Sequence, residues 1–467
     1  MVASTIRDEG PETKVPPAKR QPLVSRTVSR KIQRGLSNVA LEDRSAEQPD
    51  APSEDWVFRS FPLVTGFSSM CLAAADLAIR TVPYFRFGFF TVQLSFRLIL
   101  WVILILPVFV RFFVQYYSDA RILRRIRYGS SEREFLDVYV PSQAKAAQNS
   151  GPKLPVVVAI MGGGFVIGHR GYNVQLGLRC LDFGVLFVCL DYRNFPFATL
   201  PEMVENIGRG VRWVFQNIGT FGGDTSNMMF MGQSAGAHLG AMLILEHGLL
   251  EARHELLHTA PAAHTAEVPC NINNKNNNSN NTEIPSGSMS SVSKSSKKFD
   301  LWSVKDFKMY VGVSGPYDIE KYAPHLGLPP RVVDQLTLGH PDECSPAPLL
   351  LSDEWRALSA EVAGRLPPIH LFHGEEDKLV PAWSSVRFAE LLRNAGAQIT
   401  LDVRPGLNHT YAVVEGPASG HDIQLELILS TLLGSSSHLH SVRSSGIWPR
   451  FLLRLANKLG PFGSVPL

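Results

Sequence analysis

From about residue 127 onward, short apolar runs alternate with stretches of helical periodicity. Most apolar runs are continuous and end in glycine, proline or polar residues, which is typical of strands buried on both faces of a parallel sheet. The pattern predicts an α/β fold over residues 127–440, with a mainly parallel central sheet and helices on both faces. The predicted strands are residues 135–140, 155–160, 185–190, 228–231, 309–313, 369–372 and 399–403. A helix is predicted over 202–218, with one face formed by Val204, Ile207, Val211, Val214 and Phe215.

A strongly apolar segment, residues 56–117, precedes this domain. The thirteen residues 98–110 are apolar without a break, between Arg97 and Arg111. This run is shorter than the ~18 residues of a typical spanning helix, but its apolar neighbours extend it enough to cross a bilayer with tilt. The segment predicts one or two membrane-associated helices and the lipid bilayer as a partner; the alternative is a helical hairpin that caps the next domain. Five arginines at and after its end predict that the following domain faces the cytosol: Arg111, Arg121, Arg124, Arg125 and Arg127.

Three other segments have polar, low-hydrophobicity patterns. Residues 1–55 are rich in Pro, Ser, Arg and Glu and predict a disordered basic tail. Residues 251–300 include an Asn-rich and a Ser/Lys-rich run and predict a disordered insertion within the α/β domain. Residues 441–467 form a C-terminal tail, in which a short amphipathic helix is one interpretation.

Composition narrows the class of protein. A chain of 467 residues with 45% hydrophobic residues is too apolar to be wholly disordered. A net charge of +3 is too mild to indicate a nucleic-acid partner. The five cysteines are widely spaced and contain no CxxC pair, so they predict neither a disulfide framework nor a zinc site. Cys180 and Cys189 lie in apolar runs and are predicted to be small core residues.

The clearest chemical motif is Gly232-Gln-Ser-Ala-Gly236, a G-x-S-x-G pentapeptide between a predicted strand and an apolar helix beginning near Ala237. In this context the serine lies on a tight turn with its hydroxyl exposed above the sheet, and the glycines avoid clashes within the turn. Ser234 is therefore the predicted nucleophile.

Such a nucleophile needs a base and an acid that orients the base, in the chain order Ser, Asp/Glu, His. Asp377 follows the strand 369–372, and His409 follows the strand 399–403. Successive parallel strands deliver both to the edge of the sheet where Ser234 lies. Glu375 or Glu376 could replace Asp377. Two further histidines, His238 and His373, are expected to be structural.

An oxyanion hole is the third requirement of this chemistry. The N–H of Ala235, directly after the nucleophile, is one predicted donor. The loop Gly162-Gly163-Gly164 follows an early central strand, and its missing side chains let backbone N–H groups approach an ester oxygen. This reaction requires no metal and no cofactor.

Several motifs together resemble the isoprenylcysteine α-carbonyl methylesterases. The resemblance covers about residues 60–435 without the insertion, and it is carried by GGGFVIG (162–168), CLDYRNFP (189–196), FGGD (221–224), MGQSAGAH (231–238), SGPY (314–317) and LFHG (371–374). The glycine loop is also similar to the HGGG loop of the hormone-sensitive-lipase group, except that Met161 replaces the histidine.

The resemblance implies an α/β-hydrolase fold, a Ser-Asp-His triad, an endoplasmic reticulum or Golgi membrane location, and hydrolysis of prenylcysteine methyl esters. On the matching positions, it implies that Ser234, Asp377 and His409 are catalytic. It also implies that Gly162–Gly164 and Gln233–Ala235 contact the substrate. One alternative is a general carboxylesterase or arylformamidase-like hydrolase of small esters or amides. Another is a catalytically silent, membrane-anchored binding protein, although such relatives typically lack a member of the triad.

Overall fold

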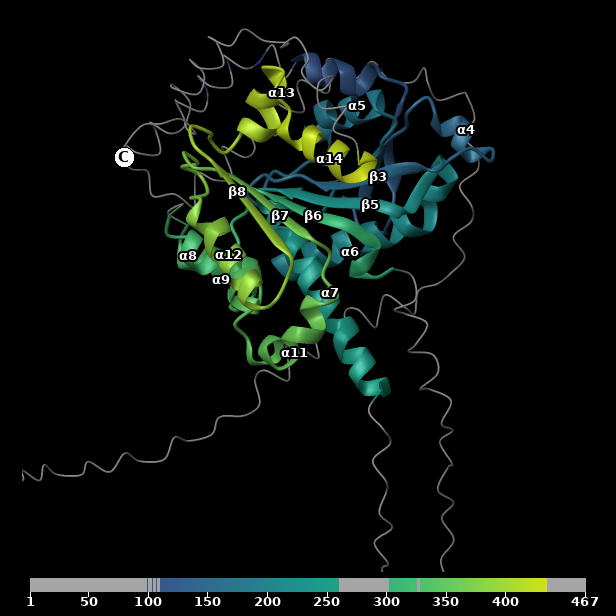
Figure 1. Cartoon of the computed structure of the whole chain (residues 1–467). Helices are drawn as coiled ribbons and strands as arrows, with labels where there is room; N and C mark the ends of the chain where they lie inside the picture. The colour runs from purple at the N-terminus through teal and green to yellow at the C-terminus, as the bar shows by residue number, and fades with distance from the viewer. Residues whose placement is uncertain are drawn as a thin grey trace, which may run out of the picture. The chain divides into compact units, whose positions relative to one another are not determined.

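The computed structural model describes residues 110–259, 302–325 and 328–434, together with Ile99, Ile103 and Leu106 (Figure 1). The predicted tails, most of the predicted membrane segment 56–117 and residues 260–300 of the predicted insertion lie outside these residues. Within the described part of the chain, no helix combines the length and the apolar character needed to cross a membrane.

The described residues form one sheet of eight strands in the order β1-β2-β4-β3-β5-β6-β7-β8. Strand β2 pairs antiparallel with both of its neighbours, and all other neighbouring strands are parallel. The predicted, mainly parallel α/β-hydrolase sheet is therefore confirmed. The strands are β1 (Ile122–Arg127), β2 (Phe135–Tyr139), β3 (Leu154–Ile160), β4 (Leu186–Leu190), β5 (Gly223–Gln233), β6 (Phe307–Val313), β7 (Ile369–Gly374) and β8 (Ile399–Arg404).

Helices cover both faces of the sheet, as predicted (Figure 1). The sheet therefore has an apolar core on each face. In strand β3, Val156 and Val158 belong to one core, and Val157 and Ala159 belong to the other. The first core packs under α6 (Leu200–Asn217), α7 (Ala235–Thr259), α11 (Asp353–Ala363) and α12 (Trp383–Asn394), and the second under α5 (Val174–Asp182) and α14 (Ile423–Leu433). Shorter helices are α4 (Ala144–Gln148), α8 (Ile319–Tyr322), α9 (Pro330–Thr337), α10 (Pro346–Leu349) and α13 (Gly416–Ala418).

Strand β1 is an element that the sequence pattern did not predict, because its sequence ILRRIR looks like a basic flank. Its outward-facing arginines are accommodated by the neighbouring strand. The guanidinium carbons of Arg125 and Arg127 lie 5.2 Å and 4.8 Å from the centre of the Phe135 ring. Ile122, at the start of the strand, is buried. Cation–π contacts thus let an arginine-rich sequence form an edge strand.

Two helices test the predicted helical pattern. Helix α6 matches the prediction, with Val204, Ile207, Val211 and Val214 buried. Helix α7 runs on to Thr259, so residues 251–259, which were predicted to begin the disordered insertion, are helical. Their polar side chains pair with the neighbouring layer: Arg253 contacts Glu354 of α11 at 2.7 Å, and Glu255 contacts Arg365. The polar composition therefore reflects an exposed helix end and not a loop.

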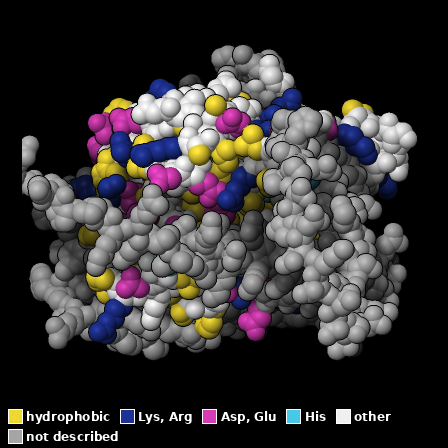
Figure 2. All heavy atoms as spheres, turned by 90° about the horizontal axis from the view of Figure 1, so that it is seen from below, with side chains coloured by type: hydrophobic (Ala, Val, Ile, Leu, Met, Phe, Trp, Pro, Cys, Tyr) yellow, Lys and Arg dark blue, Asp and Glu magenta, His cyan; other side chains and the backbone are white. Residues whose placement is uncertain are grey.

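Figure 2 shows the molecule from below, relative to the view of Figure 1. Where described residues are visible there, basic and acidic side chains are interspersed with apolar ones.

Candidate active site

Ser234 lies at the corner between β5 and α7, with a left-handed backbone φ of +52°. The corner is so tight that a Cβ on Gly232 would lie 2.3 Å from the carbonyl oxygen of Gly236. A Cβ on Gly236 would lie 2.4 Å from the carbonyl oxygen of Ile160. The Ser234 N–H donates to the Val313 carbonyl at 2.8 Å, which ties the corner to β6. Both glycines of the motif are thus required by backbone contacts, as predicted.

The structure brings the three predicted side chains together. Oγ of Ser234 lies 3.0 Å from Nε2 of His409, and Nδ1 of His409 lies 2.7 Å from Oδ2 of Asp377. Asp377 follows β7, and His409 follows β8. All three side chains are buried. This is the hydrogen-bonded arrangement in which an imidazole can take the serine proton while a carboxylate holds its tautomer.

Asp377 is held from several sides. Its Oδ1 accepts the N–H groups of Leu379 at 3.0 Å and Val380 at 2.8 Å. Burial alone would raise the pKa of Asp377, but His409 and His373 together lower it below the usual aspartate range. The carboxylate is therefore ionised at neutral pH. The alternatives Glu375 and Glu376 are both exposed.

His238 and His373 were expected to be structural. His238 is buried with its ring nitrogens 2.6 Å and 2.8 Å from the carbonyl oxygens of Pro316 and Cys344, and burial lowers its pKa to about 4. His373 contacts the Ser385 hydroxyl at 2.7 Å and the Val380 carbonyl at 2.8 Å. However, Nε2 of His373 also lies 3.2 Å from Oδ2 of Asp377. Sequence reasoning missed this contact, for which the spacing of four residues was the only signal.

The predicted glycine loop lies directly against Ser234. A Cβ on Gly162 would lie 2.6 Å from Cβ of Ser234, and Gly163 and Gly164 have φ values of +138° and +58°. No hydrogen bond joins the N–H groups of Gly163 or Gly164 to another backbone group in the described residues. The N–H of Ala235 opens α7 and has no partner within that helix. These N–H groups are therefore the available oxyanion donors.

Side chains outside the loop hold it in place. The Tyr192 hydroxyl donates to the Met161 carbonyl at 3.1 Å, and the Asn194 amide donates to the Gly168 carbonyl at 3.1 Å. On the other side, Nε2 of the Gln233 side chain lies 3.5 Å from Nε2 of His409. Gln233 is thus placed beside the imidazole.

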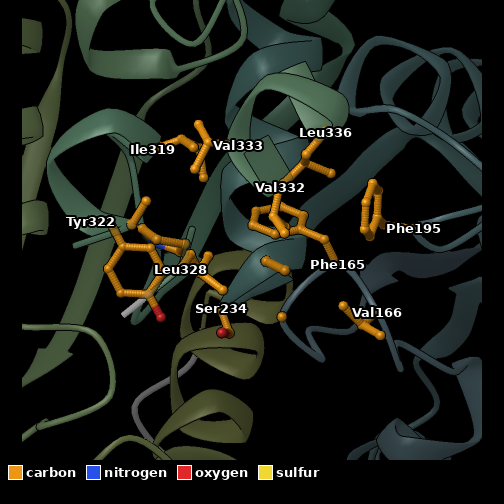
Figure 3. Close-up of a pocket in the computed structure, with 14 residues that line it drawn as sticks. Phe165, Val166, Phe195, Ser234, Ile319, Tyr322, Leu328, Val332, Val333 and Leu336 are labelled. Atoms are coloured by element: carbon orange, nitrogen blue, oxygen red, sulfur yellow. The ribbon is translucent and has the colours of Figure 1, made fainter. Parts of the chain in front are cut away.

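A cavity of about 80 Å³ opens beside Ser234 (Figure 3). One side is formed by the loops that follow β3 and β4, and the other by α8 and α9. Its wall is predominantly apolar: Gly164, Phe165, Val166, Phe195, Ser234, Ala235, Pro316, Ile319, Tyr322, Ala323, Leu328, Val332, Val333 and Leu336. In the described residues, no group of three or more His, Cys, Asp and Glu side chains is arranged to hold a metal ion.

Comparison with known proteins agrees with this architecture. The BD-FAE family model matches residues 136–392. A probable isoprenylcysteine alpha-carbonyl methylesterase of Oryza sativa subsp. japonica is 28% identical over 395 residues, which cover 83% of each chain. The isoprenylcysteine alpha-carbonyl methylesterase of Arabidopsis thaliana is 28% identical over 83% of this chain and 81% of its own.

Among solved structures, esterase B from Lactobacillus rhamnosis aligns with a TM-score of 0.48 and 18% identity, over 73% of this chain and 95% of that one. The resemblance inferred from the sequence motifs is confirmed by the two methylesterase relatives. The chain belongs to the BD-FAE family of α/β-hydrolases, is homologous to the isoprenylcysteine α-carbonyl methylesterases, and is a serine esterase of that superfamily.

Proposed function

We propose that the protein hydrolyses the methyl ester of prenylcysteine. The observation that carries this proposal is the hydrogen-bonded chain Ser234–His409–Asp377 at the wall of an apolar cavity. Homologous proteins that are named as isoprenylcysteine alpha-carbonyl methylesterases support the choice of this ester. The geometry supports an acyl-enzyme mechanism, in which each of the three residues has one role.

In the first half of the reaction, His409 takes the proton of Ser234 as Oγ attacks the ester carbonyl. Asp377 holds the imidazole and stabilises the imidazolium that forms. The N–H groups of Ala235 and the glycine loop stabilise the oxyanion. His409 then gives the proton to the methoxide oxygen, and methanol leaves. In the second half, His409 takes a proton from water as the water oxygen attacks the acyl-Ser234 carbonyl. His409 then returns this proton to Oγ of Ser234, and the carboxylic acid leaves.

The cavity suits the acyl side of such a substrate, because the methanol leaving group is small and the acyl group is large and apolar. At about 80 Å³, the cavity is too small for a whole prenyl chain, so the rest of the chain would extend beyond it. We propose that it extends toward lipid. The apolar segment 56–117 and the arginines after it support attachment to a membrane with the catalytic domain facing the cytosol. An endoplasmic reticulum or Golgi location is what the resemblance to the methylesterases implies.

A second candidate function is the hydrolysis of short esters or amides by a general carboxylesterase or arylformamidase-like enzyme. The size of the cavity favours it, since pockets for drug-sized ligands usually measure about 300–1,000 Å³. The triad itself does not discriminate, because specificity depends on the acyl and alcohol pockets.

One experiment tests both candidates. Methanol release from N-acetyl-S-farnesylcysteine methyl ester is compared with hydrolysis of p-nitrophenyl butyrate by the full chain. The proposal expects the higher kcat/KM for the farnesyl ester; a higher value for the butyrate favours the second candidate. The Ser234→Ala variant should lose about 10⁴-fold or more on both substrates. Unchanged activity in that variant would overturn the assigned nucleophile. If a fluorophosphonate failed to label Ser234, a silent binding protein would be favoured instead.

A further inference from the structure

Two side chains in the cavity wall carry a polar atom, Ser234 and Tyr322. Every other wall residue is apolar or glycine. In Figure 3 the phenol oxygen of Tyr322 points toward the same side of the cavity as the Ser234 hydroxyl. Among the described residues, none forms a hydrogen bond with this phenol oxygen. A second hydroxyl without a protein partner therefore faces the place where the acyl group would bind.

Contacts within and beside α8 orient Tyr322. Tyr322 ends α8, where the Asp318 carboxylate accepts the N–H of Lys321 and caps the helix. The ring stacks on His325, with 6.4 Å between the ring centres, and Nε2 of His325 lies 2.7 Å from the Lys378 carbonyl oxygen. Lys378 directly follows Asp377 in the sequence. Tyr322 is thus positioned relative to the same loop that carries the catalytic acid.

The chemistry of this hydroxyl follows from its surroundings. Burial, with a smaller contribution from Asp377, raises the pKa of Tyr322, so the phenol is neutral and can both donate and accept. Several other buried tyrosines pair their hydroxyls within the protein; Tyr310, for example, donates to the Ala237 carbonyl at 2.5 Å. The hydroxyls of Tyr139 and Tyr317 lack partners in the described residues, but they are enclosed. The Tyr322 hydroxyl is not enclosed in this way: Tyr322 lines the cavity, where a bound ligand can supply a hydrogen-bond partner.

We propose that Tyr322 is a substrate-binding residue whose phenol oxygen accepts a hydrogen bond from the nitrogen on the α-carbon of the acyl group. This inference rests on the proposed function. In a prenylcysteine methyl ester, the α-carbon is bonded to the carbonyl that Ser234 attacks. The substituents of the α-carbon therefore lie close to the hydroxyls of Ser234 and Tyr322. The nitrogen is the strong hydrogen-bonding group among them, whereas the thioether sulfur is a weak acceptor. Tyr322 would therefore select α-amido esters over plain carboxylic esters.

The test uses the full chain and four methyl esters in two pairs. The first pair is N-acetyl-S-farnesylcysteine methyl ester and the farnesylthiopropionate ester that lacks the acetamido group. The second pair replaces farnesyl by methyl in both esters. The Tyr322→Phe variant should lose about 3- to 10-fold in kcat/KM on the two nitrogen-bearing esters, mainly through KM, since the hydrogen bond forms in the ground state as well. It should change less than 2-fold on the two nitrogen-free esters.

The Tyr139→Phe variant is the matched control. It removes a buried, unpaired hydroxyl from β2, away from the cavity, and should leave all four esters unaffected. Equal losses of Tyr322→Phe on all four esters, or no loss on any, would overturn the proposal. If this variant did not fold, the wild-type preference for nitrogen-bearing esters, corrected for alkaline hydrolysis rates, would decide; no preference refutes the proposal. The farnesyl-to-methyl ratio of the wild type tests the proposed function separately.

Discussion

Asp377 shows how much of the site depends on a single residue. Its Oδ1 is occupied by two backbone N–H groups, while Oδ2 faces two histidine rings. The carboxylate therefore fixes its own loop and the imidazole at once. Because its folded pKa lies below the unfolded value near 3.9, its ionised form stabilises the fold above that pH. The contribution of Asp377 to the free energy of unfolding is lost as the pH falls from the unfolded pKa through the lower pKa of the folded state.

Replacing Asp377 by Asn is expected to lower kcat by about 10⁴-fold, because an amide at this position no longer favours the correct His409 tautomer. Steady-state kinetics on any hydrolysed ester measures this. The Glu375→Gln and Glu376→Gln variants are controls, because both side chains are exposed neighbours of the acid. A loss in either control that matched the Asp377→Asn loss would contradict the assignment of Asp377.

At the scale of elements, the turn after β8 has an internal support. Oε1 of Glu415 accepts the Thr410 hydroxyl at 2.7 Å and the Asn408 amide at 3.4 Å, on either side of His409. Glu415 ends a single π-helical turn, Tyr411–Glu415, and is buried. Burial raises its pKa, although the hydrogen bonds oppose this shift. We infer that Glu415 positions the catalytic histidine through its neighbours.

The Glu415→Ala variant should lower kcat about 10- to 100-fold with little change in KM, because the two donors lose their acceptor and the His409 turn loosens. Glu415→Gln keeps a carbonyl oxygen at the same place and should remain within about 3-fold of wild type. The measurement is kcat on a soluble ester, together with thermal unfolding. An alanine variant with normal kcat would rule out the positioning role.

At the scale of the whole molecule, the helix layer formed by α5 and α14 contains a buried acid. Asp422 caps α14 by accepting the Leu425 N–H at 3.0 Å, and its Oδ2 has no partner in the described residues. Burial raises its pKa to about 6. Because this exceeds the unfolded value of about 3.9, the folded state holds the proton longer. The free energy of unfolding should fall as the pH rises through this window.

Asp422→Asn should therefore raise the free energy of unfolding at pH 7.5 by roughly 1–3 kcal/mol, since Asn caps helices as well as Asp does and carries no charge. The gain should vanish near pH 4. Urea unfolding at the two pH values measures the difference. Asp353→Asn, at an exposed position in the first turn of α11, is the control and should not show this pH dependence. An equal gain for Asp422→Asn at both pH values would contradict the explanation.

Some errors of the sequence-based description arise from contacts between elements. Strand β1 has the composition of a basic flank. Its arginines are stabilised by Phe135, a residue of another strand, which the local sequence does not reveal. The end of α7 has the polar composition of a loop, but its charged side chains pair with α11 and with Arg365, two residues beyond the end of α11. In both cases the local composition is polar, and the stabilising partner is distant in sequence.

The sequence alone determined the order of the predicted strands, the turn at Ser234 and the loops that carry Asp377 and His409. These features depend on interactions between near neighbours: alternating burial, the conformational freedom of glycine, and polar residues where strands end. The tertiary structure alone decided which groups meet. His409 is 175 residues from Ser234, and their contact depends on the register of the sheet. The roles inferred for Tyr322 and Glu415 likewise follow from packing, because no local pattern indicates which buried polar group faces a cavity or a catalytic turn.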